Sequence, residues 1–279
     1  EQAEILVFER SGFVSYANCG LPYYIGGRIG DEQDLTLQTP ESFRQRFNVR
    51  IHVRHEVTAI HPDKKTVTVK DLTSGTVFTE TYDKLLLSPG AGPIKPDFAG
   101  VESDRIFTLR TVEDTLKIKA YLTTRRPQSA VVVGGGFIGI EVAENLRACG
   151  VNVTLVEAAG QLMAPFDRDM AAFLHAGLRK NGIGLLLGRM VEGFADTDGG
   201  IDVRLKDAGT LHADMAVLAI GVVPETGLAK AAGLELGIKG SIAVNDRMET
   251  SVPDIYAVGD AVQIRNFVTG ADTLISTLS

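Results

Sequence analysis

The pattern of hydrophobic and polar residues is most regular between Ala130 and Glu157. An apolar run over Val131–Val133 is short enough for a fully buried strand. Apolar residues then recur at helical intervals from Phe137 to Leu146, and a second apolar run covers Val151–Val156. The pattern therefore predicts a strand, a helix and a second strand, which is the repeating unit of an α/β fold with a parallel sheet.

The turn between the first strand and the helix carries glycines at G-x-G-x-x-G spacing, namely Gly134, Gly136 and Gly139. The first permits a tight turn, the second lets a pyrophosphate approach the backbone, and the third lets the helix pack closely on the sheet. The helix N-terminus offers free N–H groups to the phosphates. We expect a dinucleotide site here; the alternative is a glycine-rich turn in an unrelated α/β unit.

Glu157 closes the second strand, 23 positions after Gly134. A carboxylate at this place accepts hydrogen bonds from ribose hydroxyls and would repel a 2′-phosphate. No Arg stands among the residues directly after it, which are Ala158, Ala159 and Gly160. The site is therefore predicted to prefer NADH to NADPH.

The beginning of the chain, Ala3–Glu9, resembles Val151–Glu157, because both are apolar strands that end in Glu. We interpret the pair as an internal repeat in which Glu9 holds the ribose of a second nucleotide. By the same spacing, the glycine turn of this first unit is expected before residue 1. The alternative is an edge strand that ends in a solvated Glu.

Cys19 lies in the segment Ser11–Gly27, which is rich in Gly, Asn and aromatic residues. Asn18, Gly20 and Pro22 favour a tight backbone bend followed by a helix start. A thiol at a helix N-terminus favours the thiolate form and is nucleophilic, whereas a lone Cys is otherwise a small core residue. Both interpretations stay open on the residues alone. Cys149, at the end of the helix after Gly139, is expected to be a core residue.

The rest of the chain is predicted as further strands and helices. Thr39 and Pro40 mark a helix start. Segments in which apolar and polar residues alternate predict antiparallel strands. A continuous apolar run then predicts a buried strand before the turn Pro89–Gly92, and a connecting segment is expected after this turn. Later segments predict two helices and several strands, the last of which precedes Gly259 and Asp260. The ranges are 38–47 (helix), 49–60, 66–70 and 76–82 (strands), 83–88 (buried strand), 100–109 (connection), 112–122 and 167–180 (helices), and 185–187, 201–205, 215–220 and 255–258 (strands).

Composition excludes several classes. The 279 residues suggest two domains, and 44% hydrophobic with 23% charged residues is typical of a globular protein. A net charge of −7 gives no basic patch for nucleic acid, and no apolar run is long enough to span a membrane. Two cysteines make no disulfide framework, which indicates a reducing, cytoplasmic location. The five histidines do not have metal-site spacing, so no metal site is expected, and they are interpreted as surface or turn residues.

With these motifs, the chain resembles the flavin-dependent pyridine nucleotide-disulfide oxidoreductases over nearly its whole length. The bend around Cys19 is similar to the single-cysteine branch, and most similar to coenzyme A disulfide reductases. The resemblance implies that Cys19 is redox-active, with Asn18 beside it and Glu141 near the nicotinamide; a solvated Glu is the alternative for Glu141. It implies FAD and NADH as cofactors, with these binding residues: Glu9, Arg10, Ser88, Pro89, Gly90, Asp260 and Ala261, and Gly134, Gly136, Phe137, Ile138, Gly139, Glu157 and Gly221.

The implied fold is α/β with two Rossmann-like units and without the family's C-terminal interface domain. The FAD unit is expected over 1–110 and 225–279, and the NADH unit over 111–224. The implied function is electron transfer from NADH through FAD to Cys19, which reduces a disulfide or persulfide, such as a coenzyme A-related substrate, in a protein that is a homodimer at full length. The alternatives are an NADH oxidase or peroxidase that uses a cysteine sulfenic acid, and a nucleotide-binding flavoprotein without turnover.

Overall fold

The computed structural model describes residues 3–274, and its largest sheet has five parallel strands. In spatial order these are β10 (Ile106–Thr108), β17 (Met215–Leu218), β11 (Ser129–Val133), β12 (Asn152–Glu157) and β13 (Gly184–Leu187). Three helices accompany this sheet: α3 (Val112–Arg125), α4 (Phe137–Ala148) and α5 (Arg168–Lys180). The Val-rich strands are buried, as is typical of parallel strands that are covered on both faces.

A separate antiparallel sheet packs against this parallel sheet. Its strands are β14 (Val191–Asp196), β15 (Ile201–Leu205) and β16 (Gly209–Ala213). Phe194 and Ile201 are fully buried against one side of β11 and β17. The opposite side of the same strands packs with α3 and α4. The sequence indicated β15 but not β14 or β16, in which glycine and polar residues interrupt the apolar pattern.

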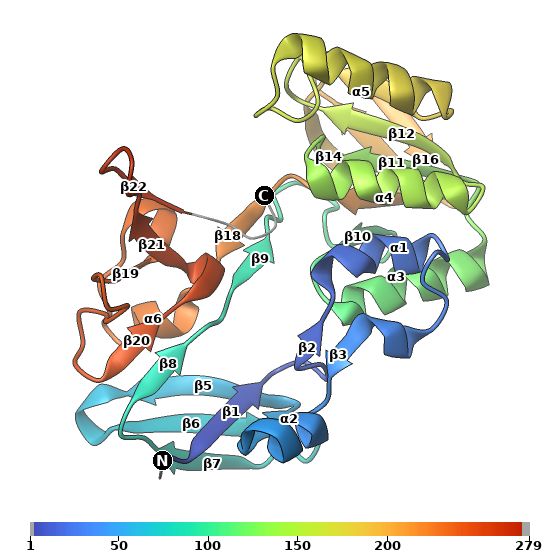
Figure 1. The fold of residues 1–279 in the computed structure, drawn as a ribbon. Coiled ribbons are helices and arrows are strands. Elements are labelled where there is room, and N and C mark those ends of the chain that lie inside the picture. Colours follow the sequence, from blue (N-terminus) through green and yellow to red (C-terminus); the bar gives the residue numbers. More distant parts are fainter. Residues whose placement is uncertain (1–2, 275–279) are drawn as a thin grey trace.

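The other part of the molecule is built from smaller sheets (Figure 1). Its core joins β6 to the segments near the C-terminal end, with Val69, Ile242 and Ile255 fully buried. It contains helices α2 (Pro40–Phe47) and α6 (Gly227–Ala231). Its strands are β1 (Ile5–Glu9) with β4 (Val49–Val53); β5 (His55–His61), β6 (Thr66–Asp71) and β7 (Val77–Thr81); β8 (Leu85–Leu87) with β20 (Ile255–Ala257); and β19 (Ile242–Ala243), β21 (Val262–Arg265) and β22 (Asp272–Thr273).

Two antiparallel strands pair at a place where the chain passes between the two parts. These are β9 (Ala91–Pro93) and β18 (Val222–Pro224). The helical segment around Cys19 lies between two short strands that pair with each other. β2 (Ser15–Tyr16) precedes this segment and β3 (Thr36–Gln38) follows it. That segment consists of the 3₁₀ turn η1 (Asn18–Gly20), helix α1 (Leu21–Ile25) and the 3₁₀ turn η2 (Glu32–Leu35), and the remaining 3₁₀ turns are η3 (Pro62–Lys64), η4 (Ile238–Gly240) and η5 (Gly259–Ala261).

Helix α1 packs on the helices of the parallel sheet, not on the smaller sheets. Leu21 and Ile25 share the buried core that also contains Ile140 and Leu146 of α4. The segment that carries Cys19 therefore rests on the glycine-turn unit, although it lies more than 100 residues before that unit in the chain.

The helix starts agree with the sequence in detail. Thr39 caps α2, its side chain accepts from the Ser42 N–H, and Pro40 is the first helical residue. Thr111 and Asp114 form a reciprocal capping box at α3. Both helices begin where these polar residues satisfy N–H groups that have no partner within the helix.

Several predictions were wrong in part. The segment 49–60 is two strands, because Arg54 adopts a left-handed backbone (φ 57°) and β4 pairs in parallel with β1. The expected connection 100–109 contains β10, an edge strand of the parallel sheet. The strand after Asp83 is not buried, since Leu86 is 58% exposed.

Two predictions about single residue types also need correction. Cys149 is not in the core: it is exposed at the end of α4, and its Sγ donates to the Ile25 carbonyl at 3.3 Å. The histidines are not all surface or turn residues. His55 is half-buried and lies in β5, where its ring stacks on Phe8 and contacts the tilted ring of His52.

Candidate functional site

The glycine turn lies at the carboxyl ends of β11 and β12, which are neighbours in the parallel sheet. Ligands of open α/β sheets bind at this edge of the sheet. Gly134 follows β11, and Gly136 is the residue from which α4 begins. Phe137 and Ile138 form the first turn of α4, with Phe137 47% exposed. The structure thus brings together the predicted residues of this motif.

The space around each glycine of the turn explains why a glycine stands there. A Cβ on Gly134 would lie 2.2 Å from the Ala219 carbonyl oxygen, and Gly134 has a φ of 110°. A Cβ on Gly139 would lie 1.9 Å from the Gly134 carbonyl oxygen. Gly136 has no atom within 4 Å of its Cβ position and is exposed. The turn is therefore closed at its two ends and open at the position where a pyrophosphate would approach.

Glu157 reaches across this turn. Its Oε2 accepts from the Gly135 N–H at 2.7 Å, and its Oε1 accepts from the Ala159 N–H at 2.7 Å. A carboxylate offers about four lone-pair positions, so each oxygen can accept one further hydrogen bond. The chemistry and position of these groups fit the ribose of a nicotinamide nucleotide.

Two further predicted residues lie near this edge. Gly221 follows β17, has a φ of 112°, and its carbonyl accepts from the Ile94 N–H at 3.0 Å where the chain crosses between the two parts. Glu141 lies on the second turn of α4. Burial, with a smaller contribution from Glu144, raises the pKa of its carboxyl above the ordinary value. Glu141 is therefore more easily protonated than a solvated Glu.

Three segments that lie far apart in the sequence carry the predicted reactive cysteine and most of the predicted flavin residues. Asn18 and Cys19 lie in η1, directly before α1, and the Cys19 residue is exposed. Ser88 and Pro89 are exposed in the turn after β8, and Gly90 adopts a φ of 73° there. Asp260 and Ala261 lie in η5, and the Asp260 side chain is only 7% exposed.

Arg110, which sequence reasoning did not single out, joins these three segments. Its Nε donates to the Ala91 carbonyl at 2.9 Å, and its Nη1 donates to Asn18 Oδ1 at 3.5 Å. Its Nη2 lies 3.8 Å from Asp260 Oδ2. No motif marks Arg110 in the sequence, and the one available signal is its place directly before the helix cap Thr111.

Glu9 and Arg10 lie at the end of β1, beside the same region. Glu9 Oε1 accepts from the Ser11 N–H at 2.6 Å. Arg10 is exposed and pairs at 3.7 Å with Glu56 of β5, which is not a predicted site residue. Burial raises the pKa of the nearby Tyr16 hydroxyl, Arg110 opposes this shift, and Glu9 adds to it. Tyr16 is a second residue that no sequence motif indicated.

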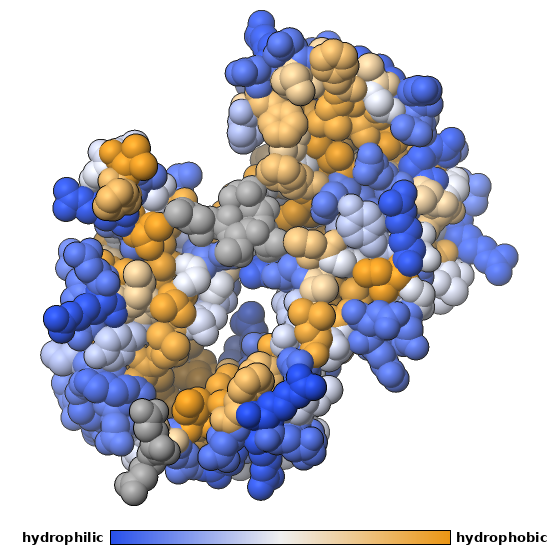
Figure 2. All heavy atoms as spheres, viewed as in Figure 1, coloured by the Kyte–Doolittle hydropathy of each residue, from blue (hydrophilic) through white to orange (hydrophobic). Residues whose placement is uncertain are grey.

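The surface here suits a large, partly apolar ligand. Figure 2 shows this face hollowed near its centre, with hydrophobic residues along part of the rim. Ile5 and Val7 of β1 and Leu86 of β8 are exposed by 50%, 38% and 58%. Apolar strands beside a buried carboxylate and an exposed turn fit a flavin nucleotide, which has a flat ring and a polyhydroxylated chain.

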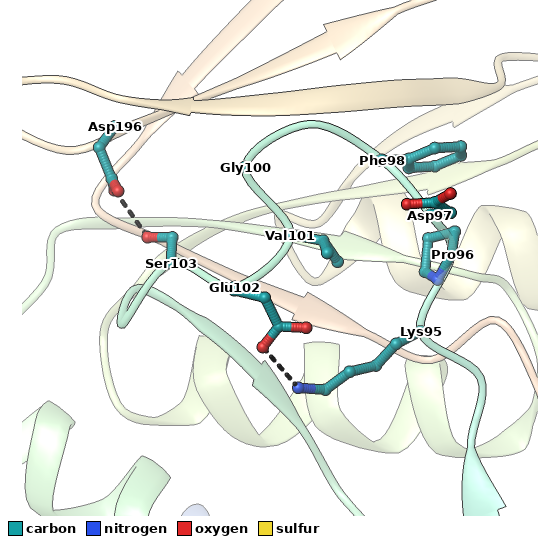
Figure 3. A pocket seen from close by; sticks show the side chains of 9 residues that line it. All are labelled: Lys95, Pro96, Asp97, Phe98, Gly100, Val101, Glu102, Ser103 and Asp196. Carbon is teal, nitrogen blue, oxygen red and sulfur yellow. Dashed lines mark hydrogen bonds and ion pairs between the residues drawn. The ribbon is translucent and has the colours of Figure 1, made fainter.

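A hollow of about 570 Å³ lies elsewhere, where the loop after β9 crosses β14 (Figure 3). Lys95 pairs with Glu102 at 3.3 Å, and the Ser103 hydroxyl donates to Asp196 at 2.6 Å. None of the predicted cofactor residues lines it, and these four polar side chains are paired with one another. We assign no ligand to this hollow.

Two kinds of feature are absent from residues 3–274. No helix in this range is long and apolar enough to cross a membrane. Within the same range, no group of three His, Cys, Asp or Glu residues is arranged to hold a metal ion.

Comparison with known proteins identifies the family. The model of the pyridine nucleotide-disulphide oxidoreductase family matches residues 1–273. A coenzyme A disulfide reductase of Staphylococcus aureus (strain JH9) is 36% identical over 260 residues, which are 93% of this chain and 58% of that protein. This chain thus spans less than two thirds of the length of that relative.

Two solved structures share the fold over 99% of this chain. The structure of reduced CoADR-RHD from Bacillus anthracis has a TM-score of 0.95 and 47% identity, and the match covers 50% of that chain. The water-forming NADH oxidase from Lactobacillus brevis, bound to NADH, has a TM-score of 0.91 and 34% identity, with 61% of its chain covered. These matches confirm the family, the α/β fold class and the cofactors expected from the sequence, FAD and a nicotinamide nucleotide, and the chain belongs to the pyridine nucleotide-disulphide oxidoreductases.

Proposed function

We propose that this protein passes electrons from NADH through FAD to Cys19, and that Cys19 reduces a disulfide or persulfide, with coenzyme A disulfide as the first candidate. The observation that carries this proposal is the setting of Cys19. The residue is exposed in a bend whose Asn18 contacts Arg110, and Arg110 also contacts Asp260 and the Ala91 carbonyl at the start of β9. The names of the Staphylococcus aureus and Bacillus anthracis relatives support the choice of substrate.

The cofactors would be held by two sets of residues. For FAD we propose Glu9 and Arg10 at the adenosine end, Ser88–Gly90 against the ring system, and Asp260 with Ala261 at the ribityl chain. For NADH we propose Gly134, Gly136, Phe137, Ile138, Gly139, Glu157 and Gly221. FAD, when bound, supplies the two-electron link between the nicotinamide and a sulfur atom.

The chain's own chemistry centres on Cys19. Its thiolate attacks one sulfur of a substrate disulfide, a mixed disulfide forms, and the first thiolate product leaves and takes a proton. Two electrons then break the bond between Cys19 and the substrate sulfur, which restores the Cys19 thiolate and releases the second thiol. The balance is one disulfide, one NADH and one proton in, and two thiols and NAD⁺ out.

Two neighbouring side chains would assist. Asn18 orients the bend that presents the Cys19 sulfur, because its side-chain oxygen accepts from Arg110. Glu141 would position the nicotinamide ring. The pKa of its carboxyl is raised, mainly by burial, and this supports a place for Glu141 at the edge of a partly desolvated site.

We further propose a preference for NADH, since Glu157 disfavours a 2′-phosphate. The FAD unit would cover 1–110 and 225–279, and the NADH unit 111–224. The structure groups β10, just before this boundary, with the sheet of the second unit. A homodimer in the cytoplasm remains part of the proposal, and the two free cysteines are compatible with a reducing compartment.

A second candidate is an NADH oxidase or peroxidase in which Cys19 cycles through a sulfenic acid. The Lactobacillus brevis neighbour, a water-forming NADH oxidase, supports this alternative. This second function would use the same cofactor-binding residues and would differ only in the acceptor that reacts with Cys19.

An acceptor screen with the purified holoenzyme tests these proposals. NADH oxidation is followed with coenzyme A disulfide, coenzyme A persulfide, hydrogen peroxide or oxygen as the acceptor. Faster turnover with a disulfide or persulfide than with oxygen or peroxide supports the first proposal. Faster turnover with oxygen or peroxide supports the second. No turnover with any of them, in a protein that binds both cofactors, would favour a nucleotide-binding flavoprotein without turnover.

A further inference from the structure

Arg110 makes contacts with three chain segments that lie far apart in the sequence. Its partners are the Ala91 carbonyl at 2.9 Å, Asn18 Oδ1 at 3.5 Å and Asp260 Oδ2 at 3.8 Å. Ala91 is the first residue of β9, directly after the turn that follows β8. Asn18 belongs to the bend that carries Cys19, and Asp260 belongs to η5. One side chain therefore joins the three segments that the proposed function assigns to the flavin and to the reactive sulfur.

The base of this side chain is itself held in place. Arg110 follows β10, and its backbone N–H donates to Asp114 Oδ2 at 3.0 Å. Asp114 also accepts from the Thr111 N–H in the capping box of α3. The guanidinium thus extends toward the flavin segments from an anchored position on the parallel-sheet unit.

The chemistry of the contacts requires an arginine. A guanidinium has five N–H donors in a rigid plane and can serve three acceptors in different directions. The side chains of Arg110 and Asp260 are only 16% and 7% exposed. Opposite charges at this distance and burial attract each other strongly, so the pair helps to fix the orientation of both side chains. Lysine would retain the charge but has a single nitrogen.

From these contacts we propose that Arg110 is a positioning residue, which holds the Cys19 bend, the turn after β8 and Asp260 together as one flavin-binding site. This inference rests on the proposed function, which assigns Asp260 and the turn after β8 to the flavin and Cys19 to the reacting sulfur.

The first test is the dissociation constant of FAD, measured by flavin fluorescence on protein that has been stripped of FAD and reloaded. Arg110→Met is expected to raise the constant about tenfold or more, because charged hydrogen bonds and a buried ion pair are lost. Arg110→Lys should lie between Met and wild type. Arg105→Met is the matched control, because Arg105 is also partly buried and near an acid, at 3.9 Å from Asp196.

A double-mutant cycle separates positioning from a general loss of stability. Asp260→Asn, Arg110→Met and the double variant are compared by FAD affinity and by thermal unfolding. The loss of FAD affinity in the double variant should be smaller than the sum of the two single losses, because either single substitution already breaks the ion pair. Additive losses, or an FAD affinity of Arg110→Met within about twofold of Arg105→Met, would overturn the proposal. If Arg110→Met does not fold, Arg110→Lys carries the same comparison.

The second readout concerns Cys19. With saturating FAD, Arg110→Met should lower NADH-dependent disulfide reduction more than NADH-dependent ferricyanide reduction, which does not need the sulfur. Equal losses in both reactions would contradict a role in holding the Cys19 bend. A wild-type enzyme that reduces no disulfide would refute the proposed function, while FAD affinity would still decide the role of Arg110.

Discussion

The Glu157 carboxylate accepts a hydrogen bond from the backbone N–H of Gly135 at 2.7 Å, although the two residues are 22 positions apart. Its second oxygen holds the Ala159 N–H at the same distance. The acid that would face a ribose therefore also fixes the turn that would face the phosphates. Its position is set before any nucleotide arrives, which reduces the ordering that binding must bring about.

This relationship gives a prediction about nucleotide choice. Glu157→Gln should lower kcat/KM for NADH by about tenfold, since the amide offers one acceptor oxygen where the carboxylate offers two. The value for NADPH should fall less, because the repulsion of the 2′-phosphate disappears. Steady-state kinetics with both nucleotides checks this, with the exposed Glu192→Gln as a control. Equal kcat/KM values for the two nucleotides in the wild type, or a preference for NADPH, would show that Glu157 does not select between them.

Alanine at Gly136 and alanine at Gly139 should affect different properties, namely NADH binding at Gly136 and the stability of the fold at Gly139. Gly136→Ala meets open space, so unfolding free energy should change by less than about 0.5 kcal/mol. NADH binding should nevertheless weaken, because the new methyl group occupies the place of the pyrophosphate. Gly139→Ala puts a carbon 1.9 Å from the Gly134 carbonyl oxygen and should destabilise the fold by about 3 kcal/mol.

Denaturant unfolding and titration with NADH measure the two glycine effects separately. A Gly136→Ala variant that binds NADH as tightly as wild type would mean that the open side of the turn does not face the nucleotide. A Gly139→Ala variant of normal stability would contradict the close approach of α4 to the turn.

Cys19→Ser should retain FAD and its reduction by NADH, since neither step needs the sulfur. Turnover of a disulfide acceptor should be lost almost completely. Cys149→Ser is the matched control, because a serine hydroxyl can replace the contact that the Cys149 thiol makes with the Ile25 carbonyl. Stopped-flow flavin reduction and steady-state acceptor turnover, measured on both variants, give the answer. Acceptor turnover that survives in Cys19→Ser but is lost in Cys149→Ser would reverse the assignment.

Asp254 predicts a pH dependence of stability. Ion pairs with Lys65 and Lys84 lower the pKa of its carboxyl from 3.8 to about 2. Because the folded-state pKa lies below the ordinary value, the stabilisation is complete above pH 3.8 and disappears as the pH falls through about 2. Asn tolerates the left-handed backbone at this position (φ 65°), so Asp254→Asn removes the charge without new strain.

The measurement is urea unfolding of Asp254→Asn and wild type between pH 2 and pH 7. Wild type should be the more stable protein at neutral pH, and the difference should shrink toward pH 2. A difference that stays constant over the whole range would mean that the ion pairs of Asp254 do not contribute through its charge.

Much of the local structure could be predicted from the sequence. The parallel strands around Val132, the start of α4 at the glycine turn, the helix that begins after Thr39 and the helix that begins at Val112 are all confirmed. The errors occurred where the pattern is short or ambiguous. The left-handed residue Arg54 divides one alternating segment into two strands, and β10 is a three-residue edge strand. Neither has a periodicity long enough to detect.

The sequence by itself determined the glycine turn, the acid at the end of the second strand and the family of the chain, because each depends on residues close together in the chain. Only the tertiary structure decided that α1 packs on α4, and that Arg110 lies among Asn18, Ala91 and Asp260. The reason is physical: contacts between segments that are 19 to 150 residues apart leave no local periodicity. They arise when the two connections β9 and β18 and the shared core bring the segments together.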